Sequence, residues 1–128
     1  MASGRHSILV VDDSTDIRET LRDVFEASGY QVDTAANGVD ALARLDVAPL
    51  PCMVVLDLMM PVMDGWQVLD AVRNQRSPGV AAVPITVLSG ALDRVQMREL
   101  KGQFRCEVLA KPAELEQLLE LAQQCCAK

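Results

Sequence analysis

The amino-acid sequence predicts a doubly wound α/β fold, with helices on both faces of a parallel sheet. Short apolar runs rich in Val, Ile and Leu alternate five times with segments whose apolar residues recur at helical spacing. This alternation is typical of βαβ units, in which successive strands run parallel. No linker, internal repeat or low-complexity tract interrupts residues 1–128, so we expect one domain with its core over about residues 7–126.

The first half of the chain supplies three of the expected strands. Residues 7–11 are an apolar, β-branched run, and the helix after them is expected to begin at Ser14 or Thr15. Residues 30–35 alternate loosely and predict the second strand, which a second helix follows. Residues 52–56 are apolar at every position, which is typical of a central strand covered by helices on both faces.

The second half of the chain continues the same alternation. A third helix is expected after Gly65, and Ser77-Pro78-Gly79 should form a turn. The remaining elements are a strand over residues 83–88, a helix over 92–101, a short strand over 106–109 and a final amphipathic helix.

Composition and charge exclude several classes of function. Half of the residues are apolar and 23% are charged, as in an ordinary globular protein. The 18 Asp and Glu outnumber the 12 Lys and Arg, and the net charge of −6 argues against nucleic acid or an anionic membrane as the partner. No apolar run approaches the ~18 residues of a membrane helix. The N-terminus lacks the apolar stretch of a signal peptide, so we expect a cytoplasmic location and no membrane association.

The four cysteines carry no recognisable motif. They lie at Cys52, Cys106 and the adjacent pair Cys125-Cys126, and no CxxC pair is present. The single histidine, His6, cannot complete a zinc site with them. We therefore expect buried or incidental thiols, without a metal or redox function.

Polar residues collect at the ends of the expected strands. Asp12 and Asp13 follow the first strand, Asp57 the third and Ser89 the fourth, while Lys111 follows the fifth. Each has an ordinary structural explanation when taken alone: helix capping, a turn or a solvated lysine. Carboxyl ends of parallel strands meet at one edge of the sheet, where ligands bind. Their joint occurrence there favours a functional site.

Three converging carboxylates repel one another, and a hard divalent cation relieves that repulsion. Mg²⁺ prefers oxygen ligands and commonly binds one or two carboxylates together with water and phosphate oxygens. Lys111 would add a second positive charge. Such a group of residues could stabilise a phosphoryl group transferred onto a carboxylate.

Four stretches resemble the receiver domain of bacterial two-component response regulators. They are residues 9–14 (LVVDDS), 55–65 (VLDLMMPVMDG), 84–90 (PITVLSG) and 110–112 (AKP). The resemblance spans nearly the whole chain and implies a flavodoxin-like sheet with the strand order 2-1-3-4-5. It also implies a phosphorelay module whose phosphoacceptor is Asp57 and whose phosphoryl donor is a histidine kinase or a histidine phosphotransfer protein.

The same resemblance implies the metal ligands. Asp13 would bind Mg²⁺ directly, and Asp12 would act largely through water. Asp57 and the main-chain carbonyl of Met59 would complete the set of protein ligands.

Two further roles and one departure follow from the family pattern. Ser89 would donate a hydrogen bond to a phosphoryl oxygen, and Lys111 would pair with another phosphoryl oxygen. The peptide bond before the proline that matches Pro112 is often cis in the family. Many receivers carry Tyr or Phe where this chain has Val108. An aromatic side chain therefore cannot report phosphorylation here.

The helix that follows Ser89 is the expected signalling surface. Leu92, Val95 and Leu100 are expected to face the core, which leaves a basic stripe on the other side. The stripe consists of Arg94, Arg98 and Lys101, and its alternative interpretation is a solvated face that pairs with local acids such as Glu99.

We therefore expect a stand-alone receiver whose output is contact with an unidentified protein. We expect it to catalyse its own phosphorylation and dephosphorylation and no other reaction. Because few residues follow Lys111, we expect no output domain beyond the last helix. A receiver excised from a hybrid kinase or from a longer regulator would have the same length. The alternative is an aspartyl-phosphate phosphohydrolase of the haloacid dehalogenase type. That class needs an acid two residues after the nucleophile, where Met59 stands, and a cap domain for which the chain is too short.

Overall fold

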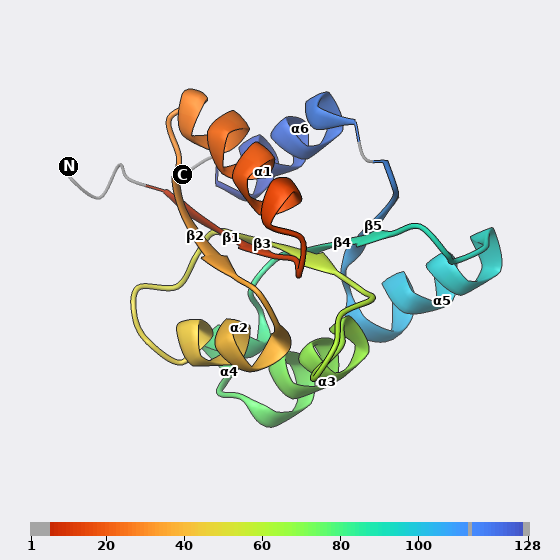
Figure 1. Ribbon diagram of the computed structural model, residues 1–128. Coiled ribbons are helices and arrows are strands. Elements are labelled where there is room, and N and C mark those ends of the chain that lie inside the picture. The colour runs from red at the N-terminus through yellow and green to blue at the C-terminus, as the bar shows by residue number, and fades with distance from the viewer. Residues whose placement is uncertain (1–5, 113, 127–128) are drawn as a thin grey trace.

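The structure, a computed structural model, describes residues 6–112 and 114–126 and has a five-stranded parallel sheet at its centre (Figure 1). The strands are β1 (Ser7–Val11), β2 (Gln31–Ala35), β3 (Met53–Asp57), β4 (Ile85–Ser89) and β5 (Glu107–Ala110). Their order, β2-β1-β3-β4-β5, confirms the predicted doubly wound topology. Residues 1–5, on which the expectation of no signal peptide rests, lie outside the described residues.

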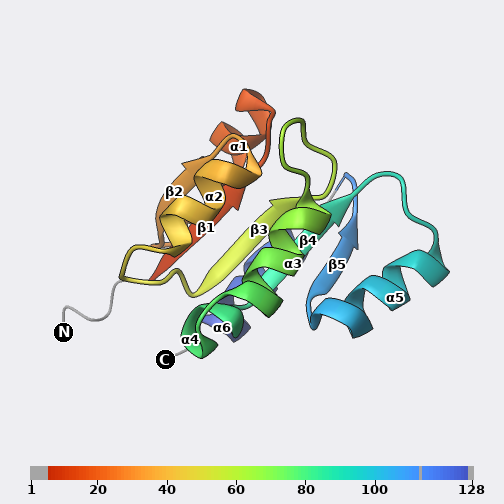
Figure 2. The ribbon, with the colours of Figure 1, turned by 90° about the horizontal axis from the view of Figure 1, so that it is seen from below.

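Helices cover both faces of this sheet. They are α1 (Thr15–Ala27), α2 (Gly38–Leu45), α3 (Gly65–Gln75), α4 (Pro78–Ala81), α5 (Arg94–Phe104) and α6 (Leu115–Cys125). In Figure 1, α1 and α6 lie on one face, and Figure 2 shows α2, α3 and α5 on the other. None of the described helices is long and apolar enough to cross a membrane.

Each face of the sheet carries its own apolar layer. The layer on the side of α2, α3 and α5 contains Leu9, Val11, Val54, Leu56, Ile85 and Val87. The opposite layer contains Ile8, Val10, Met53, Val55 and Leu88 with Leu118 and Ala122 of α6. All five residues of β3 are buried, as expected for a central strand covered on both faces.

Two local expectations were wrong. The turn expected over residues 77–79 opens the short helix α4, with Pro78 in its first turn, where proline is tolerated and its fixed φ favours the helix. Val95 is 59% exposed and does not face the core. Because Val95 and Leu100 are five residues apart, they differ by about 140° around a helix. Met97, Leu100 and Phe104, spaced by three and four residues, form the inward face of α5.

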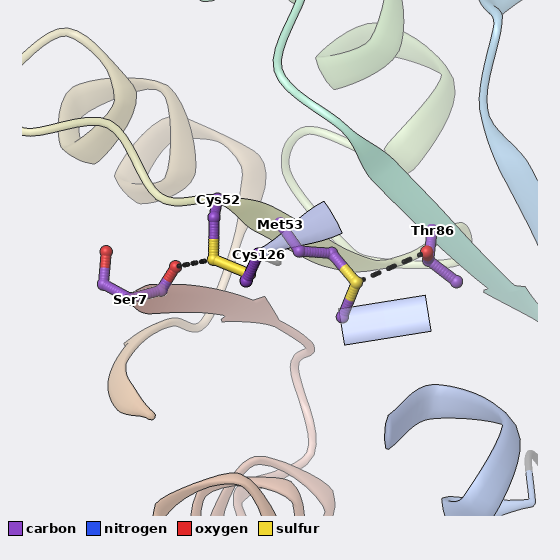
Figure 3. Close-up of a disulfide and its surroundings, with 5 residues drawn as sticks. All are labelled: Ser7, Cys52, Met53, Thr86 and Cys126. Carbon is purple, nitrogen blue, oxygen red and sulfur yellow. Dashed lines mark hydrogen bonds between the residues drawn. A yellow bond between two sulfur atoms is a disulfide. The ribbon is translucent and has the colours of Figure 1, made fainter. Parts of the chain in front are cut away.

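The cysteines also differ from expectation. Cys52 and Cys126 form a disulfide between the segment before β3 and the end of α6 (Figure 3). Cys106 is a buried free thiol and Cys125 is a partly buried one. The pairing could not be read from the sequence, because 74 positions separate the two partners and no CxxC spacing marks them.

Arg73 joins three elements on the α3 face of the sheet. Its guanidinium donates hydrogen bonds to the main-chain oxygens of Phe104 (2.7 Å), Ala81 (2.9 Å), Val83 (2.8 Å) and Arg105 (3.2 Å). These oxygens lie at the ends of α4 and α5 and just before β4. The planar, five-donor guanidinium therefore fixes the far end of α5.

Gly65 allows α3 to begin directly against the end of β3. A Cβ atom at this position would lie 2.7 Å from Cα of Leu58 and 2.9 Å from the main-chain oxygen of Asp57. Both contacts are with backbone, which cannot yield as a flexible side chain would. The small residue therefore helps to set the position of Asp57.

We expect Gly65→Ala to lower the free energy of unfolding by about 1–3 kcal/mol, as overpacking against backbone does. The matched control is Gly102→Ala in α5, where a Cβ atom would meet nothing within 4 Å. This control should be neutral or stabilising by about 0.5–1 kcal/mol, the usual helix preference for alanine. Chemical denaturation measures both variants, and equal stabilities would contradict the proposed close approach.

Candidate functional site

The structure brings the predicted polar residues together at the carboxyl edge of the sheet. Asp12 and Asp13 directly follow β1, and Asp57 and Ser89 end β3 and β4. Lys111 directly follows β5. One carboxylate oxygen from each of the three aspartates lies within 4.8 Å of the others.

Ser14, not either aspartate, caps α1. The Ser14 hydroxyl accepts a hydrogen bond from the main-chain N–H of Ile17 at 3.3 Å. Asp12 instead accepts the Ser14 N–H through Oδ1 at 2.8 Å. Since Ser14 fills the capping position, helix capping does not explain Asp12 and Asp13.

Asp12 is a buried carboxylate whose negative charge is only partly balanced. Its side chain is 2% exposed, and its Oδ2 atom is the one buried side-chain oxygen or nitrogen of the described residues without a hydrogen bond. The nearby cation is Lys111, whose Nζ lies 3.6 Å away. Burial raises the pKa of Asp12; the hydrogen bond from Ser14 opposes this shift, and the charge of Asp57 adds to it.

Asp57 is buried and held on one side only. Its Oδ1 atom accepts hydrogen bonds from Lys111 Nζ at 3.1 Å and from the Met59 N–H at 3.2 Å. Among the described residues no hydrogen bond involves Oδ2 of Asp57, which therefore remains available for chemistry. The side chain of Met59 points to solvent and is 63% exposed, so the link between Met59 and the site is through its main chain.

Lys111 is the cation of the site. Burial acts to lower its pKa, but the hydrogen bond to Asp57 and the charges of Asp12 and Asp57 outweigh burial and raise that pKa. Lys111 therefore stays protonated beside the two buried carboxylates. The peptide bond between Lys111 and Pro112 is cis, as the family resemblance implied.

Ser89 links the site to the segment before α5. Its side chain is buried, and its Oγ accepts the N–H of Ala91 at 3.3 Å. Its main-chain oxygen accepts the N–H of Lys111 at 2.9 Å. The hydroxyl proton can therefore still be donated to a ligand, while the backbone of Ser89 holds the start of the Lys111 segment.

Sequence reasoning missed one residue that shapes the site. Arg18 donates to the main-chain oxygen of Asp12 at 2.7 Å and to the Thr15 hydroxyl at 3.2 Å. It thereby holds the loop between β1 and α1 from the first turn of α1. A basic residue one turn into the helix was the available signal, but basic residues at that position are too common to be diagnostic.

The donor atoms fit Mg²⁺. Three clustered carboxylates supply hard oxygen ligands, and the buried, unpartnered Oδ2 of Asp12 shows that the protein alone does not satisfy them. The contact between Lys111 and Asp57 balances only part of the negative charge.

We expect Asp12→Asn to stabilise the metal-free protein at neutral pH. The raised pKa means that the native state binds more protons than the unfolded state, so stability falls as the pH rises through that pKa. The neutral amide removes this cost, worth roughly 1–3 kcal/mol for an unsatisfied buried group. Denaturation in a chelator should show the gain at pH 7 and its loss toward pH 3.8, the ordinary value for the side chain.

The control is Asp13→Asn, because that carboxylate is exposed and its replacement should change stability less. An Asp12→Asn protein that is no more stable than wild type at pH 7 would show that the buried carboxylate is already balanced.

Comparisons with known proteins agree with this geometry. The family described as "Response regulator receiver domain" matches residues 8–123. The response regulator MprA of Mycobacterium avium (strain 104) is 42% identical over 113 residues, which are 88% of this chain and 47% of that protein. A probable transcriptional regulator, ycf27, of Cyanidium caldarium is 33% identical over 112 residues, covering 88% of this chain and 44% of that protein. The chain thus spans a little under half the length of these two relatives.

A solved structure agrees as well. The chemotaxis protein CheY4 of Vibrio cholerae superposes with a TM-score of 0.81 at 33% identity, covering 94% of this chain and 98% of that one. The strand order, the carboxylate cluster and the matched residues all lead to one assignment, and the phosphohydrolase alternative is not favoured. The chain belongs to the receiver domain family of two-component response regulators.

Proposed function

We propose that this receiver domain takes a phosphoryl group onto Asp57 and that phosphorylation changes which protein it binds. The observation that carries the proposal is the environment of Asp57. This carboxylate is buried at the end of a central strand, one oxygen is held by Lys111, and two further carboxylates lie beside it.

The transfer step needs little from the protein beyond position and charge. An oxygen of Asp57 attacks the phosphorus of a phosphohistidine, the P–O bond forms as the P–N bond breaks, and the electron pair stays on the imidazole nitrogen, which takes up a proton. Asp12, Asp13, Asp57 and the main-chain carbonyl of Met59 would hold Mg²⁺, which when bound supplies positive charge to the phosphoryl oxygens.

Lys111 and Ser89 act on the phosphorylated side chain. The ammonium of Lys111 already lies 3.1 Å from Asp57 and can move to a phosphoryl oxygen attached to the same residue. Ser89 can rotate its hydroxyl from the Ala91 amide to donate to another oxygen. Charge-assisted contacts of this kind contribute roughly 1.5–3 kcal/mol each.

We propose a histidine kinase or a histidine phosphotransfer protein as donor and a further protein as target. With that donor we propose a cytoplasmic location, because such kinases are phosphorylated by ATP, which is found in the cytoplasm. The net charge of −6 argues against direct nucleic-acid binding by this domain. The relatives named as transcriptional regulators match over less than half of their length. Beyond its own phosphorylation and dephosphorylation, we propose no enzymatic activity.

The proposed output surface is α5. Ser89 ends β4, and only the loop up to Asp93 separates it from α5. The exposed residues of α5 include the apolar Val95, the acidic Glu99 and the basic Arg94, Arg98 and Lys101. Lys101 pairs with Glu107 at 3.6 Å, which leaves Arg94 and Arg98 as the basic residues of α5 without an ion pair among the described residues. Val108 is buried where many receivers carry an aromatic ring, and we propose that movement of the β4–α5 backbone transmits the signal instead.

Incubation with acetyl phosphate and Mg²⁺ should add one phosphoryl group, measured by intact mass. Asp57→Asn should abolish the addition, because the amide is a poor nucleophile, and a chelator should abolish it in wild type. Asp64→Asn is the matched control, since Asp64 only caps α3. Labelling of the Asp57→Asn protein at the wild-type level would overturn the proposed function.

Amide chemical shifts on binding beryllofluoride, a phosphoryl analogue, should change most between Ser89 and Lys101 and less near Val108. The reason is that Ser89 is expected to contact the analogue, and a short loop joins Ser89 to α5. The largest changes in α2 would contradict α5 as the output surface.

A further inference from the structure

The disulfide ties the carboxyl end of α6 to the amino end of β3. Cys126 is the C-cap residue of α6, and Cys52 directly precedes β3, whose last residue is Asp57. The two Cα atoms lie 5.3 Å apart although 74 positions separate them in the chain. Figure 3 shows their joined sulfur atoms near the main-chain oxygen of Ser7. The bond thus restrains α6 at the edge of the sheet opposite Asp57.

α6 has few other means of attachment. Its N-cap residue, Glu114, makes no side-chain capping bond, and no basic residue in its last turn offsets the helix dipole. The ion pairs of the described residues all lie outside α6. Apolar packing holds the helix to the sheet, through the buried Leu118, Ala122 and Cys126 and the partly buried Leu119, Leu121 and Cys125. Loss of the covalent bond should therefore loosen its carboxyl end.

The reduced form also fits the structure. Sγ of Cys52 lies 3.3 Å from the main-chain oxygen of Ser7. A disulfide sulfur has no proton to donate, whereas the free thiol of Cys52 would donate to this oxygen. Cys126 lies in an apolar cluster, where a free thiol packs as a small apolar group. Both thiols thus have suitable surroundings after reduction, although the two sulfur atoms must move apart once the bond between them is broken.

The two remaining cysteines are weak nucleophiles at neutral pH. Burial raises the pKa of the Cys125 thiol, and the charge of Glu107 adds to that rise. Burial also raises the pKa of Cys106 to about 11. Because the thiolate is the attacking species, neither reacts readily at neutral pH. Cys52 is partly exposed whereas Cys126 is buried, so Cys52 is the more accessible residue of the bonded pair.

We propose that Cys52 and Cys126 form a reversible redox latch on α6. A thiolate of a glutathione-class reductant attacks Sγ of Cys52, the S–S bond breaks, and Cys126 leaves as a thiolate that takes up a proton. A second reductant thiol then releases Cys52 from the mixed disulfide. The reductant is oxidised to its disulfide, the protein gains two electrons and two protons, and a glutathione-class disulfide reverses the reaction.

The biological setting of the latch rests on the proposed function. A phosphoacceptor served by cytoplasmic kinases meets a thiol pool that keeps most disulfides reduced, and the exceptions are commonly redox-sensing. Leu115 and Leu118 of α6 line a cleft of about 500 Å³ with Ile17, Leu21 and Lys111. Leu115 and Leu118 are in the first turns of α6, whereas the latch is at its C-cap residue, so reduction reaches this cleft only if the loosening spreads along the helix.

Thiol counting tests the bond without any use of phosphorylation. Protein purified without reductant and denatured with a maleimide should carry two labels, on Cys106 and Cys125, and four after reduction. The native protein can be equilibrated in glutathione buffers of increasing reduced fraction and then denatured for labelling. The number of labels should rise from two to four, and it should fall again when the equilibrated protein is returned to an oxidising buffer. Four labels before reduction, or two at every native glutathione ratio, would overturn the latch.

Hydrogen exchange tests the consequence for α6. Reduction should speed amide exchange in the last turns of α6 by about tenfold or more and leave α2 unchanged. Cys52→Ser, whose hydroxyl can still donate to Ser7, should reproduce the reduced state, as should Cys126→Ala. Each should lower the unfolding temperature by roughly 10 °C. Cys125→Ser is the matched control, and exchange in α6 that is identical in both redox states would refute the proposal.

Discussion

Uncompensated negative charge at the carboxyl edge of the sheet is the constraint on which this site depends. Oxygens of Asp12, Asp13 and Asp57 lie within 4.8 Å of one another, and Lys111 is the one cation ion-paired with them among the described residues. Burial raises the pKa of Asp12 and leaves one of its oxygens without a hydrogen bond. The negative charge of the site therefore favours binding of a divalent cation. After phosphorylation, Lys111 can move from the carboxylate of Asp57 to an oxygen of the phosphoryl group.

The rest of the fold keeps this unfavourable cluster in place. β3 is buried on both faces, so Asp57 cannot turn into solvent without disturbing the two apolar layers of the core. Gly65 brings α3 against the backbone of Asp57, and Arg18 holds the main chain of Asp12. Stability from packing therefore offsets the repulsion among the carboxylates. In many α/β proteins the sheet likewise provides a rigid scaffold, and the loops at its carboxyl edge hold the residues that bind ligands.

The features predicted from the sequence are those encoded in short stretches. Apolar runs ending in Asp57 or Ser89 predicted both the strands and the site, because the carboxyl ends of parallel strands share one edge. Features that depend on residues distant in sequence were not predictable: the disulfide joins positions 74 apart, and Arg73 contacts carbonyls up to 32 residues away. The inward placement of Val95 failed for a local reason, since its spacing from the core residues of α5 does not match the helical repeat.

The most direct test of this charge balance is calorimetric titration of Mg²⁺ into wild type and Lys111→Met. Lys111 shares its two carboxylate partners, Asp12 and Asp57, with the expected metal. We expect one site in each protein and an affinity in the variant that equals or exceeds that of wild type, because a competing cation has been removed. An affinity that falls tenfold or more in the folded variant would show that Lys111 helps to build the metal site, and would contradict competition between Lys111 and the metal for the two carboxylates.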